Sequence, residues 1–122
     1  MTVDEIITYC LQKKSAYIDY PFGDIPICVK VHNRIFAQIY PKVTDYKITL
    51  KCEPMMGHFY RQIYPNTVVR GYHCPPVQQP FWNTIYMNGD VSDDELKTMI
   101  DQAYRTVVLK LPKSVQKEIS NN

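Results

Sequence analysis

The stretch ICVKVHNRIFAQIY, residues 27–40, decides the fold, because it reads as two strands joined by a tight reversal. Apolar residues alternate with other residues in its first half, and a mostly apolar run fills its second half. The polar residues 32–34 separate the two halves, which is the arrangement of a β-hairpin. Strands joined in this way run antiparallel. We therefore expect a sheet that is built on antiparallel pairs.

A third strand is predicted to follow the hairpin, over residues 47–52. Successive side chains of a strand point to opposite faces. One face would carry Ile48, Leu50 and Cys52, and the other would carry Lys47, Thr49 and Lys51. The first face is apolar, as a core requires, and the second is cationic. Two further strands are predicted near residues 68–72 and 82–87.

Three amphipathic helices are predicted, over about residues 3–13, 54–63 and 93–111. Capping-box spacing marks the start of the first and the last helix, in the pairs Thr2–Glu5 and Ser92–Glu95. The element order is therefore α-β-β-β-α-β-β-α, and the last helix should stop at Pro112. This order predicts an α+β fold, a two-layer sandwich with an antiparallel five-stranded sheet packed against helices. Residues 1–122 fit a single domain.

Composition excludes several classes of protein. Fourteen basic and twelve acidic residues leave a formal charge of +2, so any basic site must be a local patch. No stretch approaches the roughly 18 apolar residues of a membrane span, and no secretory signal opens the chain, which predicts a cytoplasmic protein without a membrane partner. The four cysteines form no CxxC pair, so we expect reduced thiols and no metal site.

The residue pattern does not indicate an enzyme. The chain has only four glycines, and it contains no phosphate-cradling glycine loop, no nucleophile elbow and no paired carboxylates. His73 and Cys74 are adjacent, but no third group is placed to orient them as a catalytic pair or to complete a metal site. We therefore expect a non-enzymatic protein without a cofactor.

Short motifs are spread over nearly the whole chain: YPFGD (20–24), KVHNRIFAQI (30–39), LKCEP (50–54), GYH (71–73), WNTIYMNGDVSDDEL (82–96) and LP (111–112). In sequence and order they resemble the MmcQ/YjbR family of small bacterial proteins. The resemblance implies a two-layer α/β sandwich that is related in topology to type III secretion chaperones. That fold is also described as a double-wing DNA-binding fold, so the resemblance implies DNA binding.

The segment HCPPVQQPFW, residues 73–82, departs from the family pattern, in which basic residues and a His precede the tryptophan, roughly as HMNKxHW. The segment is three residues longer here, and no Lys or Arg lies between His73 and Trp82. The loop thus lacks the cations that would contact phosphate. Its prolines restrict the backbone, so a lengthened loop loses less entropy on ordering. This favours a structural role for the prolines.

The candidate nucleic-acid contacts fall into two groups. The first group comprises cations on neighbouring strands, which would form a face that holds a phosphate backbone. They are Lys30, Arg34, Lys47 and Lys51, and Arg70 and His73 would extend this face. The alternative for this group is a solvated outer face whose charges prevent aggregation. The second group comprises Trp82, Asn83 and Thr84, where the indole would stack on a base or fill a partner's pocket. The alternative is core packing, as for most large aromatic side chains on strands.

Two functions follow from these groups. The leading hypothesis is a non-enzymatic DNA-binding or nucleic-acid-binding protein that uses the local basic patch. The rival hypothesis is a protein-interaction module, chaperone-like or dimerising through contact with a second copy, without nucleic-acid activity.

Overall fold

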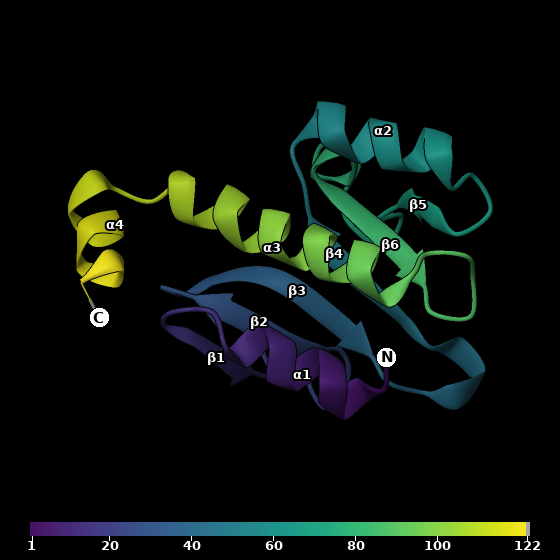
Figure 1. The fold of residues 1–122 in the computed structure, drawn as a ribbon, viewed down its shortest axis with the longest axis horizontal. Helices are drawn as coiled ribbons and strands as arrows, with labels where there is room; N and C mark the ends of the chain where they lie inside the picture. The colour runs from purple at the N-terminus through teal and green to yellow at the C-terminus, as the bar shows by residue number, and fades with distance from the viewer. Residues whose placement is uncertain (122) are drawn as a thin grey trace.

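The structure is a computed structural model that describes residues 1–121. Its helices and strands follow one another along the chain as shown in Figure 1. They are α1 (Val3–Leu11), β1 (Ala16–Asp19), β2 (Ile27–Val31), β3 (Arg34–Tyr40), η1 (Val43–Asp45), β4 (Lys47–Lys51), α2 (Pro54–Ile63), β5 (Val68–Arg70), η2 (Gln79–Phe81), β6 (Trp82–Tyr86), α3 (Asp93–Leu109) and α4 (Lys113–Ser120).

The strands form one antiparallel sheet in the order β1-β2-β3-β4-β6-β5. The predicted hairpin joins β2 to β3 through His32 and Asn33, whose φ angles are 47° and 64°. A two-residue turn with both φ angles positive matches the twist of the strands that it joins. It sets a register in which Val31 lies opposite Arg34, and a bulge between Val29 and Lys30 shifts the register so that Val29 lies opposite Ala37. After β4 the chain passes through α2 and β5, and β6 returns to lie between β4 and β5.

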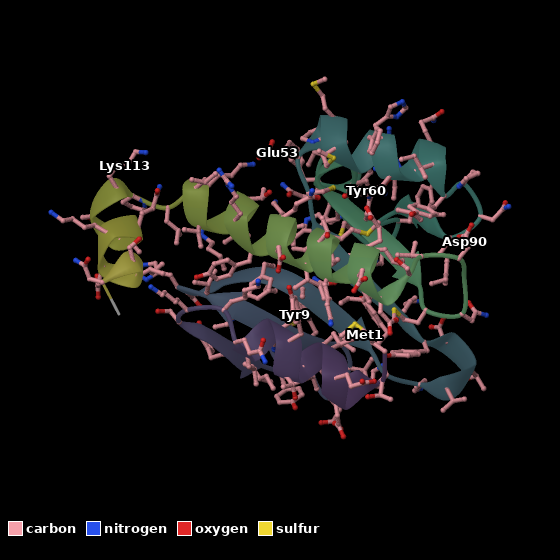
Figure 2. All side chains as sticks on the ribbon, viewed as in Figure 1. Met1, Tyr9, Glu53, Tyr60, Asp90 and Lys113 are labelled. Atoms are coloured by element: carbon pink, nitrogen blue, oxygen red, sulfur yellow. The ribbon has the colours of Figure 1, made fainter. Side chains whose placement is uncertain are left out.

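Three helices cover one face of the sheet. α1 lies over β1 and β2, α3 lies over β3 and β4, and α2 lies near β5 and β6 (Figure 1). Tyr60 of α2 points toward the sheet and α3, and it belongs to the same buried cluster as the strands (Figure 2). The apolar alternation predicted for β4 is confirmed, because Ile48 and Leu50 are buried in this cluster. The α+β class is therefore confirmed, with helices packed on an antiparallel sheet.

The prediction of five strands and three helices is wrong at two places. The sheet has six strands, because Ala16–Asp19 pairs with β2 as an edge strand that is too short to show a clear sequence period. The chain also has a fourth helix, because α3 already ends at Leu109 and Pro112 stands as the N-cap of α4. Only Val115 and Ile119 give α4 an apolar side, and Ile119 is buried.

None of the helices within residues 1–121 combines the length and the apolar composition that crossing a lipid bilayer requires.

Candidate functional site

A groove of about 430 Å³ lies at one end of the sheet. We call it the basic groove, and it is lined by Pro21, Lys30, Asn33, Arg34, Ile35, Lys51, Gln78, Trp82, Val107, Lys110 and Leu111. In the part of the chain that the structure describes, this lining contains four basic residues and no acidic residue. The basic groove therefore gathers positive charge that the overall composition does not reveal.

The sheet topology brings these residues together. Because neighbouring strands are antiparallel, β2 and β4 end where β3 and β6 begin. Lys30 and Lys51 lie on the outer face of the sheet, opposite the helices, and Lys51 is paired directly with Trp82 across β4 and β6. Arg34 follows the hairpin turn at the same end. α3 ends there as well, which adds Lys110 to the lining.

Two of the four cations are paired with carboxylates from outside the lining. Lys30 Nζ lies 2.7 Å from Asp19 Oδ2, and Lys110 Nζ lies 3.2 Å from Glu53 Oε1. The hydrogen bond to Asp19 raises the pKa of Lys30, so its charge is held firmly. Within residues 1–121, Lys51 and Arg34 have no carboxylate at ion-pair distance. The basic groove therefore retains positive charge that is not neutralised locally.

The ammonium groups of Lys51 and Lys110 both lie against aromatic rings. Lys51 Nζ lies 4.9 Å from the centroid of a Trp82 ring and 5.3 Å from that of Phe81, and Lys110 Nζ lies 5.2 Å from the same Phe81 ring. The negative faces of the rings attract both cations and offset part of their mutual repulsion. Burial lowers the pKa of Lys51, and the charge of Lys110 lowers it further. An anion bound at this wall would favour the charged form of Lys51.

Lys47 and Arg70 lie outside the basic groove. Lys47 is at the other end of β4, about 13 Å along the strand from Lys51. Its Nζ lies 2.8 Å from Asp45 Oδ2. Arg70 is the last residue of β5. Burial lowers the pKa of Arg61 on α2, and the charge of Arg70 lowers it further. The predicted cations thus do not form one continuous face, and only Lys30, Arg34 and Lys51 converge.

Asn83 and Thr84 are buried, and both hold strands in place. Asn83 Nδ2 donates to the Gly57 carbonyl at 3.1 Å, and its Oδ1 accepts from Arg61 Nη1 at 2.6 Å, which ties β6 to α2. The Thr84 hydroxyl lies 2.8 Å from that of Thr49, on the outer face of the sheet. Neither side chain is placed to contact a ligand in the basic groove. Trp82 alone of this predicted group lines the groove.

His73 anchors the proline-rich loop over the outer face of the sheet. Its Nε2 lies 2.9 Å from Oε1 of the buried Gln38, which fits an Nε2–H donor, and its ring packs edge-on against Tyr40. Within the loop, Gln79 Nε2 donates to the Cys74 carbonyl at 3.0 Å. Burial lowers the pKa of His73, as does the charge of Lys47. The loop thus covers the centre of this face, where Thr49 is fully buried. The basic groove, at the end of the sheet, stays open.

Sequence reasoning missed Lys110, the fourth cation of the groove, and Phe81, against whose ring the ammonium groups of Lys51 and Lys110 lie. The sequence shows Lys110 only as a cation that follows the last turn of the long helix. Cations are common at that position whether or not they have a function. Its approach to Lys51 depends on where α3 ends over the sheet, which no local pattern encodes. Among residues 1–121, no group of three His, Cys, Asp or Glu side chains is arranged to hold a metal ion.

Comparisons with known proteins agree on one family. The family model YjbR matches residues 11–106 of this chain. The "Uncharacterized protein YjbR" of Escherichia coli K12 is 25% identical over 117 residues, which cover 96% of each chain. The "Uncharacterized protein YbdF" of Escherichia coli O157:H7 is 28% identical over 100 residues, which cover 82% of this chain and 79% of that protein.

Solved structures show the same fold. The crystal structure of a Deinococcus radiodurans protein with a DUF419 domain superposes with a TM-score of 0.88 at 26% identity, and it covers 98% of this chain and 88% of that one. A Pseudomonas syringae protein superposes with a TM-score of 0.68 at 18% identity, covering 87% of this chain and 98% of that one. The family match extends over most of the chain and confirms the resemblance seen in its motifs. This chain belongs to the YjbR family.

Proposed function

We propose that the protein is a non-enzymatic nucleic-acid-binding protein that holds a phosphate backbone in the basic groove. The observation that carries the proposal is the convergence of Lys30, Arg34, Lys51 and Lys110 on one concavity whose described lining has no carboxylate. Lys and Arg side chains that neutralise phosphates supply most of the affinity of non-specific nucleic-acid binding. A net charge of only +2 is compatible with this function because the cations are concentrated at one place.

The energetic argument rests on Lys51. Burial of its ammonium and the charge of Lys110, whose ammonium lies against the same Phe81 ring, both lower its pKa, so its charged form is disfavoured in the unliganded protein. A phosphate between the two lysines would relieve their repulsion while it gained two charge-assisted contacts. Arg34 is exposed at the rim, where its guanidinium could bind a second phosphate in bidentate fashion.

The test is a titration of labelled duplex and single-stranded oligonucleotides at low and near-physiological salt, followed by fluorescence anisotropy. We expect salt-sensitive binding by the wild-type protein. Lys51→Gln and Lys110→Gln should each weaken binding and reduce the slope of log K against log salt by about one. No binding at low salt, where screening is weakest, would overturn the proposal.

Matched controls come from lysines outside the basic groove. Lys42→Gln removes an exposed charge near η1, and Lys47→Gln removes a charge from the same strand and the same face as Lys51. Both change the net charge as the groove variants do. Affinity losses that are equal in control and groove variants would contradict a groove site and would indicate only a diffuse attraction.

Self-association through α2 is the second candidate function, because this helix exposes an unusual number of large apolar side chains. They are Met55, Met56, Phe59 and Ile63, and the solvent-exposed fraction of Met55 is 88%. Met55 and Met56 also line an apolar groove of about 390 Å³ between α2 and α3, together with Leu109. A two-fold dimer needs one patch that is complementary to itself, and a protruding apolar helix beside an apolar groove meets that need.

Sedimentation velocity over a range of protein concentrations tests this candidate. We expect a dimer that dissociates on dilution and that is lost in Met55→Lys, with Val43→Lys as the control at a similarly exposed apolar residue. A monomer at every concentration would exclude self-association through α2.

A further inference from the structure

Three exposed aromatic residues are linked to the lining of the basic groove, as its chain neighbours or through a hydrogen bond. Pro21 lines the groove, and its chain neighbours Tyr20 and Phe22 have 52% and 63% of their surface exposed. Tyr17 is also exposed, and its hydroxyl accepts a hydrogen bond from the backbone N–H of Asn33 in the groove lining. Exposed apolar residues that gather beside a groove mark a surface that contacts a ligand.

The backbone fixes the position of these rings. Tyr20 to Gly23 form a turn in which the Gly23 N–H donates to the Tyr20 carbonyl at 3.3 Å, with Pro21 and Phe22 at the two central positions. Proline restricts its own φ angle, and Gly23 takes a φ of 103° that other residues rarely adopt. The Phe22 ring is therefore presented to solvent on a turn that loses little entropy when a ligand binds.

We propose that the basic groove binds single-stranded nucleic acid, with unpaired bases stacked on Phe22 and Tyr20 and phosphates held by the groove cations. This inference rests on the proposed function, because it names the class of nucleic acid that the groove takes. A duplex stacks its bases on one another, so exposed rings beside its backbone would gain no stacking partner. A single strand offers both a base face and a phosphate at each nucleotide.

The shape of the site supports the same choice. Proteins that read a duplex directly place a helix or a β-ribbon into a major groove of roughly 12 Å. Here Lys30, Lys51 and Lys110 line a concavity, so the ligand must enter the protein. The volume of about 430 Å³ is at the lower end of ligand sites, which suits a short part of a flexible strand. Trp82 forms part of the wall that such a strand would meet.

The experiment compares a short oligothymidylate, an abasic strand of the same length and a mixed-sequence duplex of the same length, each titrated at low salt. We expect the oligothymidylate to bind tightest and to change the fluorescence of Trp82, the only tryptophan of the chain. The double variant Tyr20→Ala with Phe22→Ala should weaken binding of the oligothymidylate by about fivefold to a hundredfold. The same variant should leave duplex and abasic affinities unchanged. Phe59→Ala, at an exposed ring on α2, is the matched control and should change none of the three.

Each outcome separates the inference from the function on which it rests. Duplex binding that equals or exceeds single-strand binding would overturn the inference and leave the proposed function standing. Equal affinity for the abasic strand and the oligothymidylate would overturn base stacking without any variant. Loss of affinity in Phe59→Ala that equals the loss in the double variant would also overturn it. Absence of binding to all three ligands would overturn the proposed function itself.

Discussion

Lys51 and Trp82 are directly paired across β4 and β6, and the Lys51 ammonium lies 4.9 Å from the centroid of a Trp82 ring. The pair places a desolvated cation and an aromatic face side by side on one wall of the basic groove. Phe81 extends this wall, and the Lys110 ammonium lies 5.2 Å from the centroid of its ring. The charge state of the groove therefore depends on how the two lysines influence each other.

Removing the charge of Lys110 should raise the pKa of Lys51. Burial is the larger cause of the low pKa of Lys51, and the repulsion by Lys110 adds to it. Lys110→Gln removes only the repulsion, so the titration of Lys51 should move to higher pH. An NMR titration that follows the side-chain Cε shift of Lys51 measures this directly. Lys113→Gln, on α4, is the control that should leave the titration unchanged (Figure 2). An unchanged pKa in Lys110→Gln would show that the two ammonium groups do not interact.

Gly57→Ala should destabilise the protein although alanine favours helices. In an open helix position this change gains about 1 kcal/mol. At Gly57 the new Cβ would lie 2.6 Å from Cys52 Sγ and 3.1 Å from Arg61 Nη1. Overpacking of this kind costs about 1–3 kcal/mol, which exceeds the helix gain. Chemical denaturation measures the free energy of unfolding. Adding Cys52→Ala to Gly57→Ala should recover part of the loss, and a double variant no more stable than Gly57→Ala would refute the clash.

Asn83→Ala should lower stability without a direct effect on the groove. The change leaves the Gly57 carbonyl and the Arg61 guanidinium without the partner that Asn83 provides. Leaving a buried polar group unsatisfied costs about 1–3 kcal/mol. The free energy of unfolding should fall by this amount, and Asn88→Ala at an exposed position should change it little. Wild-type stability in Asn83→Ala would show that water replaces both contacts.

The hairpin and α3 were predictable because their signals are local. The polar turn at His32 and Asn33 and the capping spacing of Ser92 and Glu95 each act over a few residues. β1 and α4 were missed because each is short and gains its stability from tertiary contacts. In α4 only Ile119 is buried, so the sequence carried little periodic signal.

The site was predictable only in part, for a physical reason. Lys30 and Lys51 were recognised because strand alternation places them on one face. Lys47 shares that face but lies at the other end of β4, and alternation contains no information on position along a strand. The role of Asn83 depends on α2, which packs against β6 from a distant part of the chain. Lys110 likewise joins the groove through the placement of α3.

Thr49 and Thr84 should show strong coupling in a double-mutant cycle. Their hydroxyls lie 2.8 Å apart and both side chains are buried on the outer face of the sheet. Thr49→Val or Thr84→Val alone leaves one buried hydroxyl without its partner, at a cost of about 1–3 kcal/mol. The double variant replaces both hydroxyls by methyl groups of similar shape, so it should lose less than the sum of the single changes. Additive losses in chemical denaturation would contradict a mutual hydrogen bond.

Stability should fall as the pH drops through the ordinary range of histidine, and His73 should be responsible for part of this. Burial and then the charge of Lys47 lower its pKa in the folded state, so the unfolded chain binds more protons in the window below about 6.5. The free energy of unfolding therefore decreases as pH falls through that window and recovers as pH rises. His73→Gln should make this decrease shallower, as measured by denaturation at neutral and mildly acidic pH. His58→Gln, at an exposed residue of α2, is the matched control for the loss of a histidine. An unchanged slope in His73→Gln would mean that the loop accommodates the protonated ring at no cost.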